Sequence, residues 1–168
     1  MRIYKITSRH SQLVDVSTPH SQADISGVGF QKAVILPWDY DSIGQGTWSY
    51  GSFGGNQFLN GVFTNSAAPA DGDNVSYKVY LAKGTYTLIV FGGKDTNAGI
   101  MDIDIDGTEV ASFDQYADTQ TTNVRFEKTG INITSDGIKT LRFRVDGKNA
   151  NSTDYIIRVS YIVLIRTA

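Results

Sequence analysis

The sequence contains no cysteine and only two histidines. The missing cysteine excludes disulfides, zinc–thiolate sites and thiol nucleophiles. A Ser-His-Asp triad or a zinc site built on histidine would need His10 or His20, and neither lies in a recognisable motif. The chain also lacks a G-x-S-x-G elbow, an H-E-x-x-H motif and a Walker-type phosphate loop. These absences predict a protein that binds or assembles and is not an enzyme.

No run of like charges is present either. Lys and Arg total 15 against 17 Asp and Glu, and the basic residues never cluster along the chain, so the electrostatic pattern needed for phosphate binding is missing. We therefore expect no nucleic-acid partner. The first residues lack an apolar signal-peptide region, and the longest apolar stretches have the length of a strand, so we expect no signal peptide and no membrane insertion. This favours synthesis in the cytoplasm.

What the sequence does contain is glycine, tyrosine and an alternation of apolar with polar residues. Alternation with period two is typical of half-buried strands, and no stretch keeps the i, i+3, i+4 spacing of a helix. Asp-Gly pairs at 106–107, 136–137 and 146–147 and Gly92-Gly93 mark turns or strand ends. The predicted strands are 1–6, 33–36, 48–53, 75–81, 85–91, 101–105, 110–113, 122–127, 131–134, 141–145 and 155–166.

This pattern predicts an all-β fold, namely an antiparallel two-sheet jelly-roll β-sandwich. The length suits one domain over residues 1–168, with a less regular N-terminal arm and connection over 1–32 and the sandwich over 33–168. In the last predicted strand both faces are apolar towards its end. That is expected of a central strand or of one covered by a neighbouring subunit.

Asp102, Asp104 and Asp106-Gly107 match the opening of an EF-hand calcium loop, where alternate carboxylates converge on the ion. The twelfth position of that loop would be Phe113, where a bidentate glutamate is required. Apolar alternation instead places these acids on the exposed outer face of a strand. We predict no metal site and no cofactor.

Residues 37–56 hold both tryptophans of the chain, interleaved with tyrosines and short polar residues. An aromatic ring can stack on the CH face of a sugar while neighbouring polar groups exchange hydrogen bonds with its hydroxyls. Core packing or a protein interface is, however, the more common fate of each such ring. The candidate glycan-binding residues of this segment are Trp38, Asp39, Tyr40, Trp48 and Tyr50.

Two loops share a pattern, since Gly93-Lys94 with Asn97 returns as Gly147-Lys148 with Asn151. If both loops lie at one end of the sandwich, their polar residues could form a second site, because loops at sandwich ends commonly carry recognition. The same residue types are also the commonest in solvated hairpin turns. The candidate residues are Lys94, Asp95, Asn97, Lys148, Asn149, Asn151 and Asp154.

Three stretches resemble strand motifs of carbohydrate-binding modules with a galactose-binding-like jelly roll: AKGTYTL at 82–88, DIDIDGTEV at 102–110 and GIKTL at 137–141. The resemblance implies this fold and, less directly, sugar binding. The stretch from Ile35 to Trp48, with the C-terminal strand, resembles C-terminal domains of phage and virus structural proteins such as tail fibres and spikes. That likeness implies a homotrimer that binds a cell-surface glycan. With the missing signal peptide, it also implies a location in a virion, or outside the cell after release.

Together these observations lead to one main hypothesis and two alternatives. The main hypothesis is a non-enzymatic viral or phage-like structural jelly roll, homotrimeric, that presents a glycan- or receptor-binding surface or contacts another virion protein. The first alternative is a standalone, monomeric carbohydrate-binding module. A weaker alternative is an enzyme acting on glycans, because a catalytic carboxylate pair is defined by its separation in space.

Overall fold

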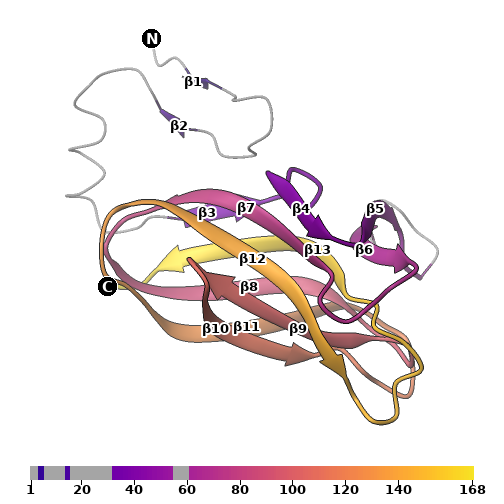
Figure 1. The fold of residues 1–168 in the computed structure, drawn as a ribbon. Coiled ribbons are helices and arrows are strands. Elements are labelled where there is room, and N and C mark those ends of the chain that lie inside the picture. Colours follow the sequence, from indigo (N-terminus) through magenta and orange to yellow (C-terminus); the bar gives the residue numbers. More distant parts are fainter. Residues whose placement is uncertain (1–3, 6–13, 16–31, 55–60) are drawn as a thin grey trace.

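The computed structural model describes residues 4–5, 14–15, 32–54 and 61–168, and Figure 1 shows their arrangement. In these ranges the chain forms strands and no helix, so the all-β prediction is confirmed. Nothing in the described part could therefore cross a membrane as a helix. The strands are β1 (Tyr4–Lys5), β2 (Val14–Asp15), β3 (Lys32–Ile35), β4 (Ser42–Gln45), β5 (Thr47–Ser52), β6 (Gly61–Ala67), β7 (Asn74–Leu81), β8 (Gly84–Lys94), β9 (Gly99–Ile105), β10 (Thr108–Asp114), β11 (Thr121–Ile133), β12 (Gly137–Lys148) and β13 (Arg158–Arg166).

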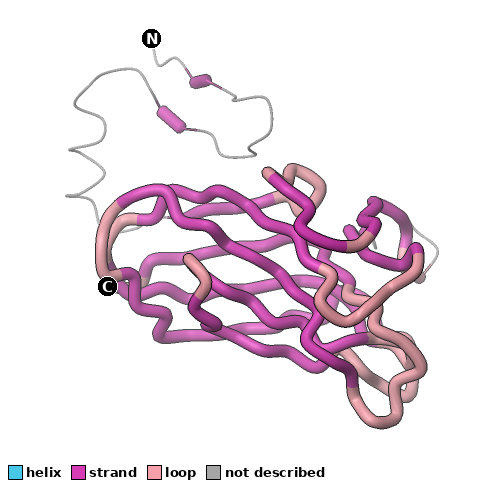
Figure 2. Tube along the Cα trace, in the orientation of Figure 1, coloured by secondary structure: helices cyan, strands magenta, loops and turns pink. Residues whose placement is uncertain are grey.

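The strands form two antiparallel sheets that face each other (Figures 1 and 2). The first sheet has the order β10-β9-β12-β7-β4, and the second has the order β11-β8-β13-β6-β5, with β3 also paired to β13. β1 and β2 pair only with each other among the described strands. The predicted two-sheet jelly-roll sandwich is confirmed, whereas most of the predicted arm at 1–32 lies outside the described residues.

The core lies between the sheets and is built from the inward-facing residues of both. Val79, Leu141 and Phe143 come from the first sheet, and Leu88 and Leu164 come from the second; all five are fully buried. Each such side chain contributes about 1.5–3 kcal/mol relative to exposure. The alternation visible in the sequence is thus the contact pattern of a single apolar layer.

Two adjacent glycines continue β8 instead of ending it, so the predicted strand end at Gly92-Gly93 was wrong. A Cβ at Gly92 would overlap the carbonyl oxygen of Arg158, and a Cβ at Gly93 would overlap the ring of Phe53. The glycines are therefore required by the close approach of neighbouring groups. Likewise β12 runs past Asp146-Gly147 to Lys148, and the two strands predicted at 122–127 and 131–134 form one bulged strand, β11 (Thr121–Ile133). β4 and β6 were not predicted.

The last strand is central in its sheet, with β8 on one side and β3 and β6 on the other. It begins at Arg158, not at Tyr155. A register shift between Val159 and Tyr161 reverses its alternation, so that Val159, Ile162 and Leu164 all face the core. Its apolar character is explained within one chain and requires no second subunit.

The acidic strand β9 differs from the prediction in one respect. Asp102 and Asp104 lie opposite Arg144 and Arg142 of β12, and both carboxylates are buried. Arg142 donates to Asp104 through Nε at 2.7 Å, and Arg144 donates to Asp102 at 3.2 Å. The expected exposed acidic face was therefore wrong, because the arginines of the adjacent strand cover these acids.

Candidate functional site

The Trp-rich segment places two aromatic rings together at the surface. Trp38 follows β3 and Tyr50 lies in β5; their side chains are 42% and 46% exposed. The ring centroids are 4.7 Å apart, and the ring planes meet at 66°. We call this pair the aromatic corner. Tyr50 belongs to the edge strand of the second sheet, and Trp38 lies in the turn between β3 and β4, the edge strand of the first sheet.

Two other aromatic residues of the segment stack on Phe63, the residue of β6 that pairs with Tyr50. Trp48 is only 7% exposed and stacks on Phe63 at 5.6 Å, and Tyr40 stacks on Phe63 at 5.5 Å. Trp48 also donates its indole N–H to the carbonyl oxygen of Gln45 at 3.0 Å. Trp48 and Tyr40 are therefore placed in and against the core, which was the alternative left open by the sequence.

Two hydrogen bonds fix the turn that carries Trp38. Tyr77, fully inside the sandwich, donates its hydroxyl to the carbonyl oxygen of Pro37 at 2.7 Å, and Asp39 N donates to the carbonyl oxygen of Leu36 at 3.0 Å. Burial raises the pKa of Tyr77 far above its usual value, so the hydroxyl stays a neutral donor. A ring carried on such a turn is pre-organised for a ligand.

Two carboxylates follow Trp38, and their roles differ. Asp41 accepts a hydrogen bond from the backbone N–H of Lys78, while its own N–H donates to the carbonyl oxygen of Ser76 at 2.9 Å, so it joins β4 to β7. The carboxylate of Asp39 is half-buried, and within the described ranges it makes no hydrogen bond or ion pair. Asp39 is therefore the polar group beside the corner that remains available to a ligand.

The two loops that share the pattern of Gly-Lys followed by Asn do lie side by side at one end of the sandwich. Thr153 N donates to the carbonyl oxygen of Thr96 at 3.0 Å, and Ile156 N donates to that of Asn97 at 3.2 Å. We call this region the loop end. It also includes the connection between β10 and β11, because Asp95 N donates to the carbonyl oxygen of Gln115 at 3.1 Å.

Most polar atoms of the loop end already have partners within it. Asn149 donates to Asp114 at 2.7 Å and accepts from the N–H of Asn151 at 3.0 Å. Asp154 accepts from the N–H of Tyr155 at 2.9 Å. These bonds are typical of turns in which Asn and Asp hold their own backbone.

The lysines of the loop end lie over aromatic rings. The amine of Lys94 is 5.9 Å from the ring centroid of Phe126, and that of Lys148 is 4.6 Å from that of Tyr155. Such cation–π contacts hold each lysine close to the protein surface. The structure thus brings the candidates Lys94, Asp95, Asn97, Lys148, Asn149, Asn151 and Asp154 to one end of the molecule, mostly as parts of turns.

Arg158, which the sequence reasoning missed, lies beneath these loops and is 6% exposed. Its guanidinium donates to Asn97 at 2.7 Å, lies 3.6 Å from the Asp95 carboxylate and covers the ring of Phe53 at 4.5 Å. Desolvation lowers the pKa of Arg158, and Asp95 opposes that shift. An arginine between Ile157 and Val159 was the available signal, because a charge in an apolar strand needs a buried partner.

Tyr116 was also missed. It lies in the connection between β10 and β11, pairs through its backbone with Asp95, and hydrogen-bonds Asp118 through its hydroxyl. That hydrogen bond, more than burial, raises the pKa of Tyr116. The sequence signal would have been an aromatic residue within a polar loop.

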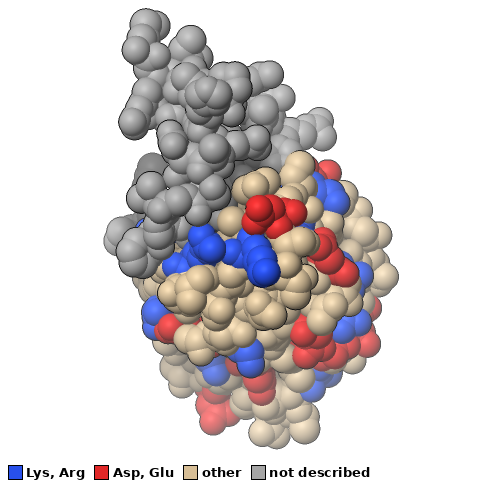
Figure 3. Space-filling model, turned by 90° about the vertical axis from the view of Figure 1, so that its left-hand side faces the viewer, with Lys and Arg blue, Asp and Glu red and all other residues tan. Residues whose placement is uncertain are grey.

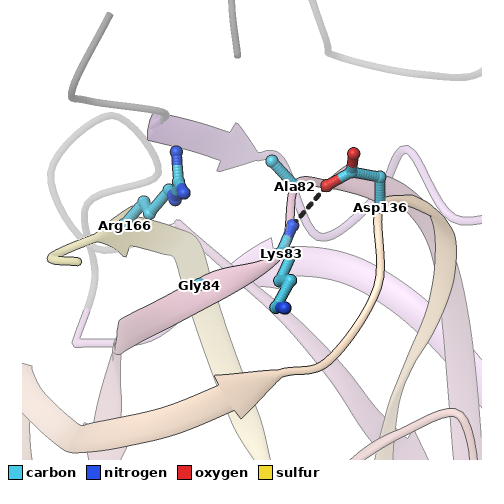
Figure 4. A pocket seen from close by; sticks show the side chains of 5 residues that line it. All are labelled: Ala82, Lys83, Gly84, Asp136 and Arg166. Carbon is cyan, nitrogen blue, oxygen red and sulfur yellow. Dashed lines mark hydrogen bonds between the residues drawn. The ribbon is translucent and has the colours of Figure 1, made fainter. Parts of the chain in front are cut away.

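A surface hollow lies at the other end of β8, opposite the loop end (Figure 4). Its lining residues are Ala82, Lys83, Gly84, Asp136 and Arg166. Asp136 accepts from the backbone N–H of Lys83 at 2.6 Å, and Figure 4 shows the side chains of Lys83 and Arg166 pointing away from one another. Basic and acidic side chains are interspersed on this end (Figure 3). The two cations therefore do not converge on one anion.

Among the described residues, no three His, Asp or Glu side chains come together in a way that could hold a metal ion. Asp102 and Asp104, the acids that matched the start of a calcium loop, are held by arginines instead. The described part of the chain thus provides an exposed aromatic pair and a rigid loop end.

No protein-family model and no curated protein matches the sequence. Solved structures do match its fold. A xanthan lyase from Paenibacillus matches with a TM-score of 0.62 and 23% identity over 76% of this chain, which spans only 12% of that enzyme. A family 35 carbohydrate-binding module from Clostridium thermocellum matches with a TM-score of 0.54 and 16% identity, over 80% of this chain and 97% of the module.

The module CsCBM6-3 from Clostridium stercorarium, solved with cellobiose, has a TM-score of 0.56 and 17% identity, over 80% of this chain and 94% of the module. At these identities the likeness concerns the fold. The expected resemblance to carbohydrate-binding modules is confirmed in that sense. The resemblance to phage and virus structural proteins stays a prediction.

Proposed function

We propose that this protein is a carbohydrate-binding module without catalytic activity and that its ligand stacks on the aromatic corner. The observation that carries the proposal is that Trp38 and Tyr50 are both exposed and contact each other. The fold, shared with modules from Clostridium stercorarium and Clostridium thermocellum, supports the same class of function. This was the alternative, not the main hypothesis, drawn from the sequence.

The chemistry of the corner suits a sugar. A pyranose has an apolar CH face, and an indole or phenol ring offers a flat apolar surface with a polar edge. Asp39 lies next to Trp38 and can accept hydroxyl hydrogen bonds. A few polar groups beside aromatic rings are the usual composition of a small-ligand site.

The loop end supports this function less well. Asn97, Asp114 and Asn149 already have hydrogen-bond partners, and the cation of Arg158 is buried. A ligand would have to displace these bonds, and each displaced group would lose a contact worth about 1 kcal/mol. We therefore regard its residues as supporting elements of the loops.

The homotrimer, the virion partner and the cellular location stay predictions from the sequence. The assignment of residues 1–168 to a single domain is likewise a proposal, supported by one apolar core shared by both sheets. The burial of Ile162 and Leu164 within one chain removes one reason for expecting a trimer.

A glycan array followed by calorimetry tests the proposal. We expect the full-length protein to bind at least one oligosaccharide, and Trp38→Ala and Tyr50→Ala each to weaken binding about tenfold or more. The matched control is Tyr161→Ala, because Tyr161 is 39% exposed and its ring stacks on that of Phe91, whereas Trp38 and Tyr50 contact each other. Tyr161→Ala should leave the affinity unchanged.

Two results would reject the proposal. One is a wild-type protein that binds no glycan. The other is a set of variants in which Trp38→Ala and Tyr50→Ala bind as well as the Tyr161→Ala control. Release of product from a bound glycan would contradict the absence of catalysis.

A further inference from the structure

We infer that the aromatic corner selects uncharged sugars, that Asp39 is the acceptor for their hydroxyls, and that acidic sugars are excluded by charge. This inference rests on the proposed function and names its class of ligand. It comes from the distribution of charge around the corner.

The segment that builds the corner contains no basic residue. From residue 33 to residue 77 there is no Lys, Arg or His, while Asp39, Asp41, Asp71 and Asp73 all lie in this range. The segment contributes β4, β5, β6 and most of β3. Its formal charge is therefore −4, although the net charge of the whole protein is only −2.

Two basic residues, at positions 32 and 78, flank this segment. Lys32 begins β3 and pairs with Ile165 of β13. Lys78 lies on β7, and its amine donates to the hydroxyl of Thr140 on β12 at 2.5 Å. Lys78 is therefore directed across its own sheet, and no ion pair with a described residue neutralises Asp39.

A carboxylate at this position favours neutral sugars over acidic ones for electrostatic reasons. A carboxylate accepts hydrogen bonds from hydroxyl groups, and such charge-assisted bonds are stronger than those to a neutral amide. The same carboxylate repels a uronate or sulfate group brought within a few ångströms. Salt screens this repulsion, so it is strongest at low ionic strength.

The test compares one oligosaccharide in two charge states. The hexose oligosaccharide that binds tightest on the array is oxidised at C6, which replaces primary hydroxyls by carboxylates. We expect the wild-type protein to bind the neutral form at least about fivefold more tightly than the oxidised form at low salt. The ratio should fall as the ionic strength is raised towards about 0.5 M.

The variant Asp39→Asn tests the role of the carboxylate. We expect it to bind the neutral sugar about threefold to tenfold more weakly and to bring the ratio of neutral to oxidised affinity closer to one. The matched control is Glu109→Gln, which removes an exposed carboxylate on β10, at the opposite edge of the first sheet from β4. That control should change neither the affinity nor the ratio.

The outcomes separate the two claims. If Trp38→Ala abolishes binding but the oxidised sugar binds as tightly as the neutral one, the inference about charge fails and the proposed function stands. The inference also fails if Asp39→Asn leaves both the affinity and the ratio at wild-type values. If Trp38→Ala has no effect on any glycan, the proposed site fails, and the inference fails with it.

Discussion

The aromatic corner and the loop end both consist of residue types that recognise ligands, yet they differ in how far those groups are already engaged. At the corner, two rings are exposed and the carboxylate of Asp39 has no partner among the described residues. At the loop end, Asn149, Asp154 and Arg158 are bound to their own loops. Composition identifies both regions as candidates, and the unengaged carboxylate of Asp39 is the reason for proposing the aromatic corner, and not the loop end, as the binding surface.

The largest expected effect is a difference in stability between the alanine variants of the two tryptophans. Trp48→Ala should lower the free energy of unfolding by about 3–5 kcal/mol, because it removes a buried ring that stacks on Phe63. Trp38→Ala should lower it by less than about 1 kcal/mol, because Trp38 is largely exposed. Urea unfolding of both variants measures the difference, and equal losses would mean that Trp38 is part of the core.

The second effect concerns the loop end. Arg158→Met should lower the free energy of unfolding by about 2–4 kcal/mol, since Asp95 and Asn97 lose a buried partner while Met keeps an apolar contact with Phe53. Glycan affinity of the folded protein should not change. If Arg158→Met instead removed binding while stability stayed at the wild-type value, the loop end and not the corner would be the site.

The smallest expected effect is a pH dependence of stability caused by Asp146, which lies near the end of β12. Hydrogen bonding and charge repulsion from Asp102 raise the pKa of Asp146 in the folded state, and burial adds to this. A carboxyl with a raised pKa stabilises the fold when protonated, so this contribution is present below the unfolded pKa, near 4, and is lost as the pH rises through the folded value.

Asp146→Asn stands in for the protonated form. Its stability relative to wild type should therefore increase from about pH 4 upwards, as shown by thermal unfolding at a series of pH values. Glu109→Gln serves as the control for loss of a surface charge. A difference between Asp146→Asn and wild type that is constant with pH would contradict the assignment.

The alternation of apolar and polar residues in the sequence correctly predicted several of the main strands. Alternation over 75–81 and 101–105 became β7 and β9, because the period of a strand is a property of its own residues. The boundaries at Gly92-Gly93 and Asp146-Gly147 were wrong because the role of a glycine depends on which distant atoms approach it. β4 is short and fully exposed, so it carries no apolar signal.

The candidate residues of the corner were all named from the sequence, but their roles were not separable there. Trp38 and Trp48 lie ten positions apart in one aromatic segment, yet in the structure Trp48 is buried against Phe63 of β6 and Trp38 is exposed. Arg158 was missed because its partners, Asn97 and Phe53, are distant along the chain.

By itself, the sequence determined an all-β chain, its main strands and turns, and the absence of basic residues from 33 to 77, because composition and alternation are local properties. Tertiary structure alone decided which acids are paired with arginines, which tryptophan faces solvent and which loop residues are already engaged. These outcomes depend on contacts between strands far apart in the chain, and the register of β12 against β9, which covers Asp102 and Asp104, is one such contact.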